Sequence, residues 1–109
     1  MKKITKELEL IDTEYIFEGG HLQGYIDIDY ATLKKLFGQP GNSDGYKVDA
    51  EWEINTPAGN ASIYNYKDGK NYLGSKGTPK TKIRDWHIGG NNENVVAWIY
   101  AYVFYKLNK

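Results

Sequence analysis

The clearest alternation of apolar and polar residues runs from Tyr46 to Ile54. Every second position in this stretch is apolar, and the positions between carry lysine or an acidic residue. Because side chains on a strand point alternately to opposite sides, this pattern predicts a strand with one buried and one solvent-facing side. The segment TPAGN then predicts a turn, and residues 61–67 predict the returning strand of a hairpin.

The same alternation assigns the side chains of the returning strand to its two sides. If Ile63 faces the core, Asn65 and Lys67 continue that side toward the end of the strand. The opposite side then carries Tyr64 and Tyr66. We therefore expect two aromatic rings on the side that the partner strand fills with charged residues.

Three weaker patterns predict further strands. Residues 3–17 alternate loosely, and residues 24–30 place Ile26 on one side and Tyr25 on the other. Residues 82–90 predict another strand, which a glycine pair closes. The sequence thus indicates a small antiparallel sheet.

Two helices complete the predicted fold. The first begins at Asp29 or Tyr30 and ends at Gly38, where the glycine and a nearby proline form a stop signal. The second has Asn92 as its N-cap and continues to about Lys106 with a broad apolar face. We therefore predict an α+β fold, a small antiparallel sheet with two helices packed on one face, in a single domain over residues 1–109.

Composition narrows the kind of protein. The chain has no cysteine, which excludes disulfides, thiolate metal sites and cysteine nucleophiles. The amino terminus has basic residues but no following apolar run, so we predict no signal peptide. The longest apolar stretch, VVAWIYAYVFY, is too short to span a bilayer. We expect no membrane partner and a location in the cytosol of a host cell.

Charge is unevenly distributed although the net charge is zero. Residues 1–55 carry eleven acids against six lysines, whereas residues 56–109 carry three acids against eight basic residues. Six basic residues lie between Lys67 and Arg84, where Asp68 is the only acid. Charge patterns of this kind concern partners rather than fold, and an exposed, solvated surface is the simplest explanation for such a run.

Catalytic chemistry has little support in the sequence. Asp85 and His87 would share one side of a strand, but Ser62 and Ser75 are weak candidates for a nucleophile beside them. The two histidines have no metal-ligand spacing, and the glycine-rich pieces lack the P-loop and dinucleotide fingerprints. We predict that the protein is not an enzyme and has no catalytic residue, metal or cofactor.

A binding site is better supported, because aromatic and basic residues gather around the segment IYNYKDGKNYLG. Rings can stack on bases and cations can contact phosphate, which a nucleotide or a single strand requires. The same residue types also serve as anchors on a protein surface, and tyrosines also pack on sheets for structural reasons alone. The candidate binding residues are Tyr64, Asn65, Tyr66, Lys67, Lys70, Asn71, Tyr72, Lys82, Arg84, Trp86 and His87.

Three stretches resemble a group of small proteins of bacteriophages and mobile elements: FGQPGNSDGYKVDAEWEI, ASIYNYKDGKNYLG and DWHIGG followed by a helix. The resemblance covers about residues 30–100. The function of that group is poorly defined, so it supplies no catalytic residue. It implies a phage setting, in which small non-enzymatic proteins act as counter-defence factors.

Our leading hypothesis is a non-enzymatic, anti-CRISPR-like inhibitor of a host defence protein, such as a CRISPR effector that handles nucleic acid. The alternatives are a sponge that sequesters a nucleotide signal and a small accessory protein that binds nucleic acid. The acidic segment from Glu7 to Asp29 is an alternative contact, as a local mimic of nucleic acid. The sequence does not specify an oligomeric state.

Overall fold

The computed structural model describes residues 20–41 and 45–108. The strand predicted over residues 3–17 lies outside the described residues, as does most of the acidic segment. The elements, in chain order, are β1 (His21–Asp27), α2 (Tyr30–Phe37), β2 (Glu51–Thr56), β3 (Gly59–Tyr64), α3 (Lys70–Leu73), the 3-10 helices η1 (Gly74–Lys76) and η2 (Lys80–Lys82), β4 (Asp85–Gly90) and α4 (Asn94–Leu107).

The strands form one antiparallel sheet in the order β1-β4-β3-β2. The first strand of the described chain therefore pairs with the last one, and β2, β3 and β4 follow one another across the sheet. This architecture confirms the predicted α+β class and the antiparallel sheet. The short helix α3 was not predicted, and the packing of two helices on one face stays a prediction.

The register of the strands separates an apolar face of the sheet from a polar face. Trp52 lies opposite Ile63, Ile63 opposite Ile88, and Ile26 opposite Trp86, and all five side chains are buried. Opposed residues in a ladder share a face, so these side chains form one continuous apolar layer. The alternation predicted for β2 and β3 is thus confirmed at these positions.

Side chains from α2 and α4 join the same hydrophobic core. Tyr30 of α2 places its ring 5.7 Å from that of Trp52 and 6.3 Å from that of Trp86. On α4, Val95 and Ile99 are fully buried in the core. A helix of eight residues is too short to be stable alone, so α2 depends on this packing.

Two predictions about the ends of the hairpin strands are wrong. Strand β2 begins at Glu51, and Tyr46, predicted to be buried, is 56% exposed. Strand β3 ends at Tyr64, and Lys67, predicted to continue the core side, is exposed. Lys67 has a φ of 64°, so the chain turns out of the strand there and the alternation no longer determines the side chain's direction.

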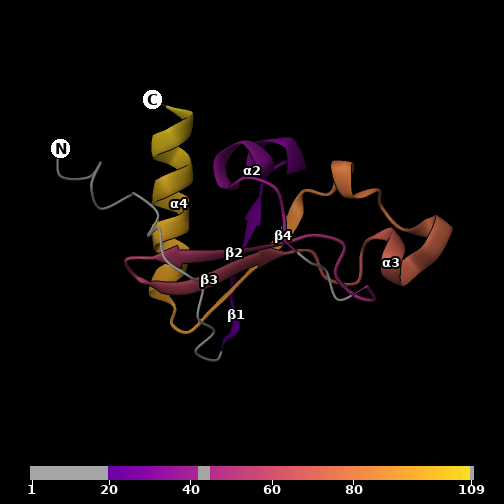
Figure 1. The fold of residues 1–109 in the computed structure, drawn as a ribbon, viewed down its shortest axis with the longest axis horizontal. Helices are drawn as coiled ribbons and strands as arrows, with labels where there is room; N and C mark the ends of the chain where they lie inside the picture. The colour runs from indigo at the N-terminus through magenta and orange to yellow at the C-terminus, as the bar shows by residue number, and fades with distance from the viewer. Residues whose placement is uncertain (1–19, 42–44, 109) are drawn as a thin grey trace.

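The connection from β3 to β4 extends beyond one end of the sheet. Figure 1 shows α3 and α4 at opposite ends of the long axis of the molecule, with α3 carried by this connection. The connection contains α3, η1 and η2, and the residues just before β2 lie beside it, because Lys67 donates its backbone N–H to the Lys47 carbonyl at 2.8 Å. Most of the candidate binding residues lie on or next to this extension.

Trp52→Ala should reduce the free energy of unfolding by about 3–5 kcal/mol, because it opens a large cavity in the core. Trp52 is 2% exposed, and its Nε1 donates a hydrogen bond to the Gly38 carbonyl at 2.8 Å. Thermal and urea denaturation measure the loss. The matched control Glu53→Ala changes the exposed neighbour and should stay within about 0.5 kcal/mol of wild type. An unchanged melting temperature for Trp52→Ala would contradict the assigned faces of β2.

Candidate functional site

The polar face of the sheet carries a row of four residues across all its strands. Glu51 lies opposite Tyr64, Tyr64 opposite His87, and His87 opposite Tyr25. The row runs near the end of the sheet from which the β3–β4 connection extends. Tyr25 is 58% exposed, whereas Tyr64 and His87 are half-buried.

His87 lies at the centre of a cluster of tyrosine rings. Its ring centre is 5.0 Å from that of Tyr25, 5.4 Å from that of Tyr64 and 5.6 Å from that of Tyr66. The first two contacts are edge-to-face, a favourable geometry for aromatic rings. Since Tyr66 is 40% exposed, ring surface in this cluster is open to a ligand.

Gly89 leaves room for this cluster on the polar face. A Cβ atom at this position would lie 3.1 Å from Ser62 Oγ and 3.3 Å from Cε1 of Tyr64. Both distances are tighter than ordinary van der Waals contact. The absence of a side chain at Gly89 therefore allows the Tyr64 ring to lie close to the backbone of β4.

Burial determines the protonation of the two central residues. Burial lowers the pKa of His87 below its ordinary value of 6.5, while the carboxylates of Asp68 and Asp85 act in the opposite direction. Burial also raises the pKa of the Tyr64 hydroxyl above 10.0, and the nearby Glu51 carboxylate adds to this effect. Both side chains are therefore neutral at pH 7, so the cluster offers rings and neutral polar groups.

A second pair of rings lies beyond the sheet, where α3 meets the segment before β2. The ring centres of Tyr46 and Tyr72 are 5.3 Å apart. Lys47 Nζ lies 5.6 Å from the Tyr46 ring centre and 6.0 Å from that of Tyr66. Lys67 Nζ lies 5.3 Å from the Tyr66 ring centre and 5.5 Å from that of Tyr72. Each ammonium group thus lies near one ring of the His87 cluster and near one ring of the Tyr46–Tyr72 pair.

We name these residues the tyrosine–lysine surface; its members are Tyr25, Tyr46, Tyr64, Tyr66, Tyr72, His87, Lys47 and Lys67. Four of its tyrosines are at least 37% exposed. Tyrosine and lysine at such spacing can stack on planar groups and neutralise anions. The surface can therefore bind a ligand that combines aromatic rings with negative charge.

The buried amide of Asn65 holds the backbone beneath this surface. Its Oδ1 accepts hydrogen bonds from the backbone N–H groups of Asp49 at 2.7 Å and Ala50 at 3.0 Å. Its Nδ2 donates to Oδ1 of Asp49 at 2.9 Å and to Oδ1 of Asp68 at 3.0 Å. Asn65 thereby joins the start of β2 to the beginning of the β3–β4 connection.

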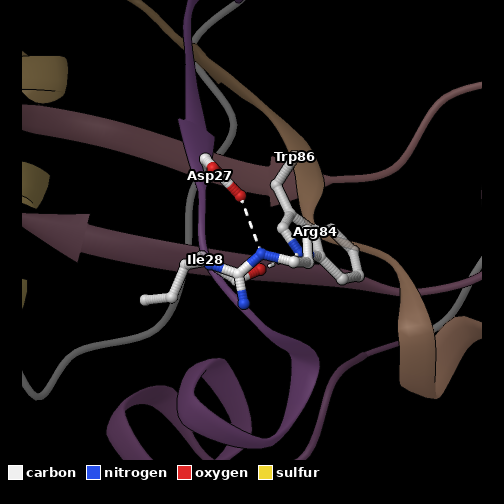
Figure 2. Close-up of polar contacts among 4 residues, drawn as sticks. All are labelled: Asp27, Ile28, Arg84 and Trp86. Carbon is white, nitrogen blue, oxygen red and sulfur yellow. Dashed lines mark hydrogen bonds and ion pairs between the residues drawn. The ribbon is translucent and has the colours of Figure 1, made fainter.

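Asn65 and Trp86, two of the predicted binding residues, are fully buried. Trp86 packs in the core and donates its Nε1 hydrogen to the Ile28 carbonyl at 2.9 Å, as Figure 2 shows. The amide of Asn65 has both of its polar atoms engaged within the protein. The expectation that these two residues contact a ligand is therefore corrected: both are structural.

The remaining predicted residues surround the connection but lie outside the tyrosine–lysine surface. Arg84 pairs with Asp27, with Nε 2.9 Å from Oδ1, and both side chains are largely exposed (Figure 2). Lys82 lines a shallow groove of about 450 Å³ together with Arg84 and three acids, so its charge is partly compensated locally. Lys70 Nζ donates to the Ser75 carbonyl at 3.4 Å, and Asn71 Nδ2 donates to the Val48 carbonyl at 3.1 Å.

Sequence reasoning missed Tyr25, Tyr46 and Lys47 as members of the site. The alternation of residues 24–30 already placed Tyr25 on the polar side, which was a usable signal. The alternation does not give the strand order, however, and only the pairing of β1 with β4 places Tyr25 opposite His87. Tyr46 was misplaced because β2 begins later than the alternation indicated.

Within residues 20–41 and 45–108, we find no cluster of three or more His, Cys, Asp or Glu side chains suited to a metal ion. Among the helices that the structure describes, none has the length and apolar character needed to cross a membrane.

Asn65→Ala should destabilise the protein by at least about 1–3 kcal/mol, the cost of leaving one buried donor unpaired. Asn65→Asp should cost more at neutral pH, because the new carboxylate would face Asp49 and Asp68, and acidification should restore part of the loss. Urea denaturation at two pH values measures both effects, with the exposed Lys70→Ala as control. A melting temperature equal to wild type for Asn65→Ala would show that the amide is dispensable.

His87 should make stability depend on pH. Because burial lowers the pKa of His87 in the folded protein, the unfolded state binds a proton more readily. The contribution of neutral His87 to the free energy of unfolding is therefore fully present above the ordinary pKa of 6.5. It is lost as the pH falls toward the folded pKa. His87→Phe should flatten the stability profile between pH 7 and pH 5, measured by denaturation. His21→Gln, at the exposed start of β1, is the control. An equally steep profile in His87→Phe would assign the dependence to other groups.

Comparison of the chain with protein-family models, with curated proteins and with solved structures finds no match. The resemblance to small phage proteins therefore stays a prediction.

Proposed function

We propose that this is a non-enzymatic binding protein whose ligand is a nucleotide or a single-stranded nucleic acid. The observation that carries the proposal is the tyrosine–lysine surface, where exposed rings alternate with ammonium groups on one side of the molecule. Stacking of a base on an aromatic ring contributes about 1–3 kcal/mol, and every base has a face for it. Lysines add attraction to phosphate and make binding sensitive to salt.

The surroundings of His87 support binding rather than catalysis. Three tyrosine rings pack around the His87 imidazole. If His87 were a catalytic base, it would need a nucleophile within hydrogen-bonding reach in this space. Asn65, which is buried and fully engaged, gives the surface a fixed frame. A fixed frame reduces the entropy that is lost when a ligand binds.

A second candidate function is contact with a host defence protein, such as a CRISPR effector, as the resemblance implies. The specific observation behind it lies on α4, where Phe104 is 70% and Leu107 is 53% exposed. Together with Tyr100, these side chains line a groove of about 650 Å³ beside α2. A contiguous patch of exposed apolar side chains is typical of a surface that contacts another protein.

Tyr66→Ala should weaken binding of a fluorescein-labelled ten-nucleotide thymidine strand by about 5- to 150-fold, the loss of one stacking contact. It should cost much less stability than Ile63→Ala, which opens a cavity at a fully buried position. Lys67→Glu should also weaken binding and reduce its salt dependence. Fluorescence anisotropy and thermal melting on the same variants measure these effects.

The outcome also separates the two candidates. If Tyr66→Ala melts as early as Ile63→Ala, the tyrosine is structural and this binding surface is wrong. If the wild-type protein binds neither the strand nor nucleotides, the nucleic-acid proposal fails. The wild-type protein would then be tested for inhibition of target cleavage by a purified effector. Loss of this inhibition in Phe104→Asp, with inhibition retained in Tyr66→Ala, would favour the protein partner.

A further inference from the structure

The tyrosine–lysine surface contains two separate places for a planar group. The first is the cluster around His87, in which Tyr25 and Tyr66 are the more exposed rings. The second is the pair formed by Tyr46 and Tyr72, which come from the segment before β2 and from α3. Each place has ring surface that is open to solvent, so each can accept one base.

Two ammonium groups each lie over one ring of the first place and one ring of the second. Lys67 Nζ is 5.3 Å from the Tyr66 ring centre and 5.5 Å from that of Tyr72, so the two ring centres are at most about 11 Å apart, the sum of these distances. Lys47 Nζ bridges Tyr66 and Tyr46 in the same way, at 6.0 Å and 5.6 Å. Rings of the two places thus share their neighbouring cations, as a phosphate that joins two stacked bases would require.

The acids near the first place indicate which part of a ligand it accepts. Asp68 and Asp85 lie close enough to affect the pKa of His87, and Glu51 acts on Tyr64 in the same way. Their carboxylates repel a phosphate but can accept hydrogen bonds from the N–H groups of a base, such as N3–H of thymine. The phosphate is consequently favoured beside the lysines and a base is favoured beside His87.

Resting on the proposed function, we infer that the ligand is a single-stranded nucleic acid of which at least two consecutive nucleotides are bound. One base stacks on the open rings of the His87 cluster, and the next base stacks on the Tyr46–Tyr72 pair. The phosphate that joins them lies between Lys47 and Lys67. The two bases are splayed onto separate rings, as in many complexes of proteins with single strands.

The length of the ligand tests this inference. We use the labelled ten-nucleotide thymidine strand as tracer, and as competitors thymidine 5′-monophosphate and a thymidine dinucleotide with a 5′-phosphate. The dinucleotide should displace the tracer at a concentration at least tenfold lower than the mononucleotide, because it fills both places. Equal potency of the two competitors would overturn the inference and would leave a protein that binds mononucleotides. If the wild-type protein binds neither the tracer nor either competitor, the proposed function itself is overturned.

Variants locate the two places and the phosphate. Tyr72→Ala should remove most of the advantage of the dinucleotide over the mononucleotide, since it disrupts the second place and leaves the His87 cluster intact. Lys47→Gln and Lys67→Gln should each lower the salt dependence of dinucleotide binding by about one counterion. Lys106→Gln, on α4 at the opposite end of the molecule, is the matched control and should leave it unchanged. An undiminished advantage of the dinucleotide in Tyr72→Ala would overturn the assignment of the second place.

Discussion

The hydrogen bonds of Asn65 are the constraint on which the shape of the tyrosine–lysine surface depends. A buried amide is stable only if its donors and acceptors are paired, and here both of its polar atoms are engaged by backbone and carboxylate groups. These bonds take the place of the ladder hydrogen bonds just before β2 begins and just after β3 ends. They fix the point at which the chain leaves the sheet, and thereby the positions of Tyr66 and Lys67.

The carboxylate of Asp49 extends this constraint to α3. Besides the Asn65 amide, it accepts the backbone N–H of Asn71 at 3.2 Å through Oδ2. It packs so closely on Gly69 that a Cβ there would lie 2.0 Å from its Oδ1. The glycine is therefore required for the approach of the carboxylate, and this approach brings Tyr72 toward Tyr46.

The sheet divides the aromatic residues of the chain between two tasks. On the apolar face, the rings of Trp52 and Trp86 meet at 5.4 Å and close the core. On the polar face, Tyr64 and His87 are half-buried among other rings, and their neighbours remain exposed. The high aromatic content thus serves both stability and the proposed contact with bases. The strand register decides which rings pack in the core and which lie on the polar face.

The sequence by itself determined the class of the fold and the two faces of the hairpin, because alternation along a strand depends only on local backbone geometry. It also placed Tyr66 outside the core and ended α2 at Gly38, where a φ of 87° suits glycine. Only the tertiary structure decided that Trp86 is buried and that Tyr25 meets His87, since both depend on which strands are neighbours. The start of β2 and the end of β3 were also beyond the sequence, because the hydrogen bonds of Asn65 at that point reach residues up to sixteen positions away.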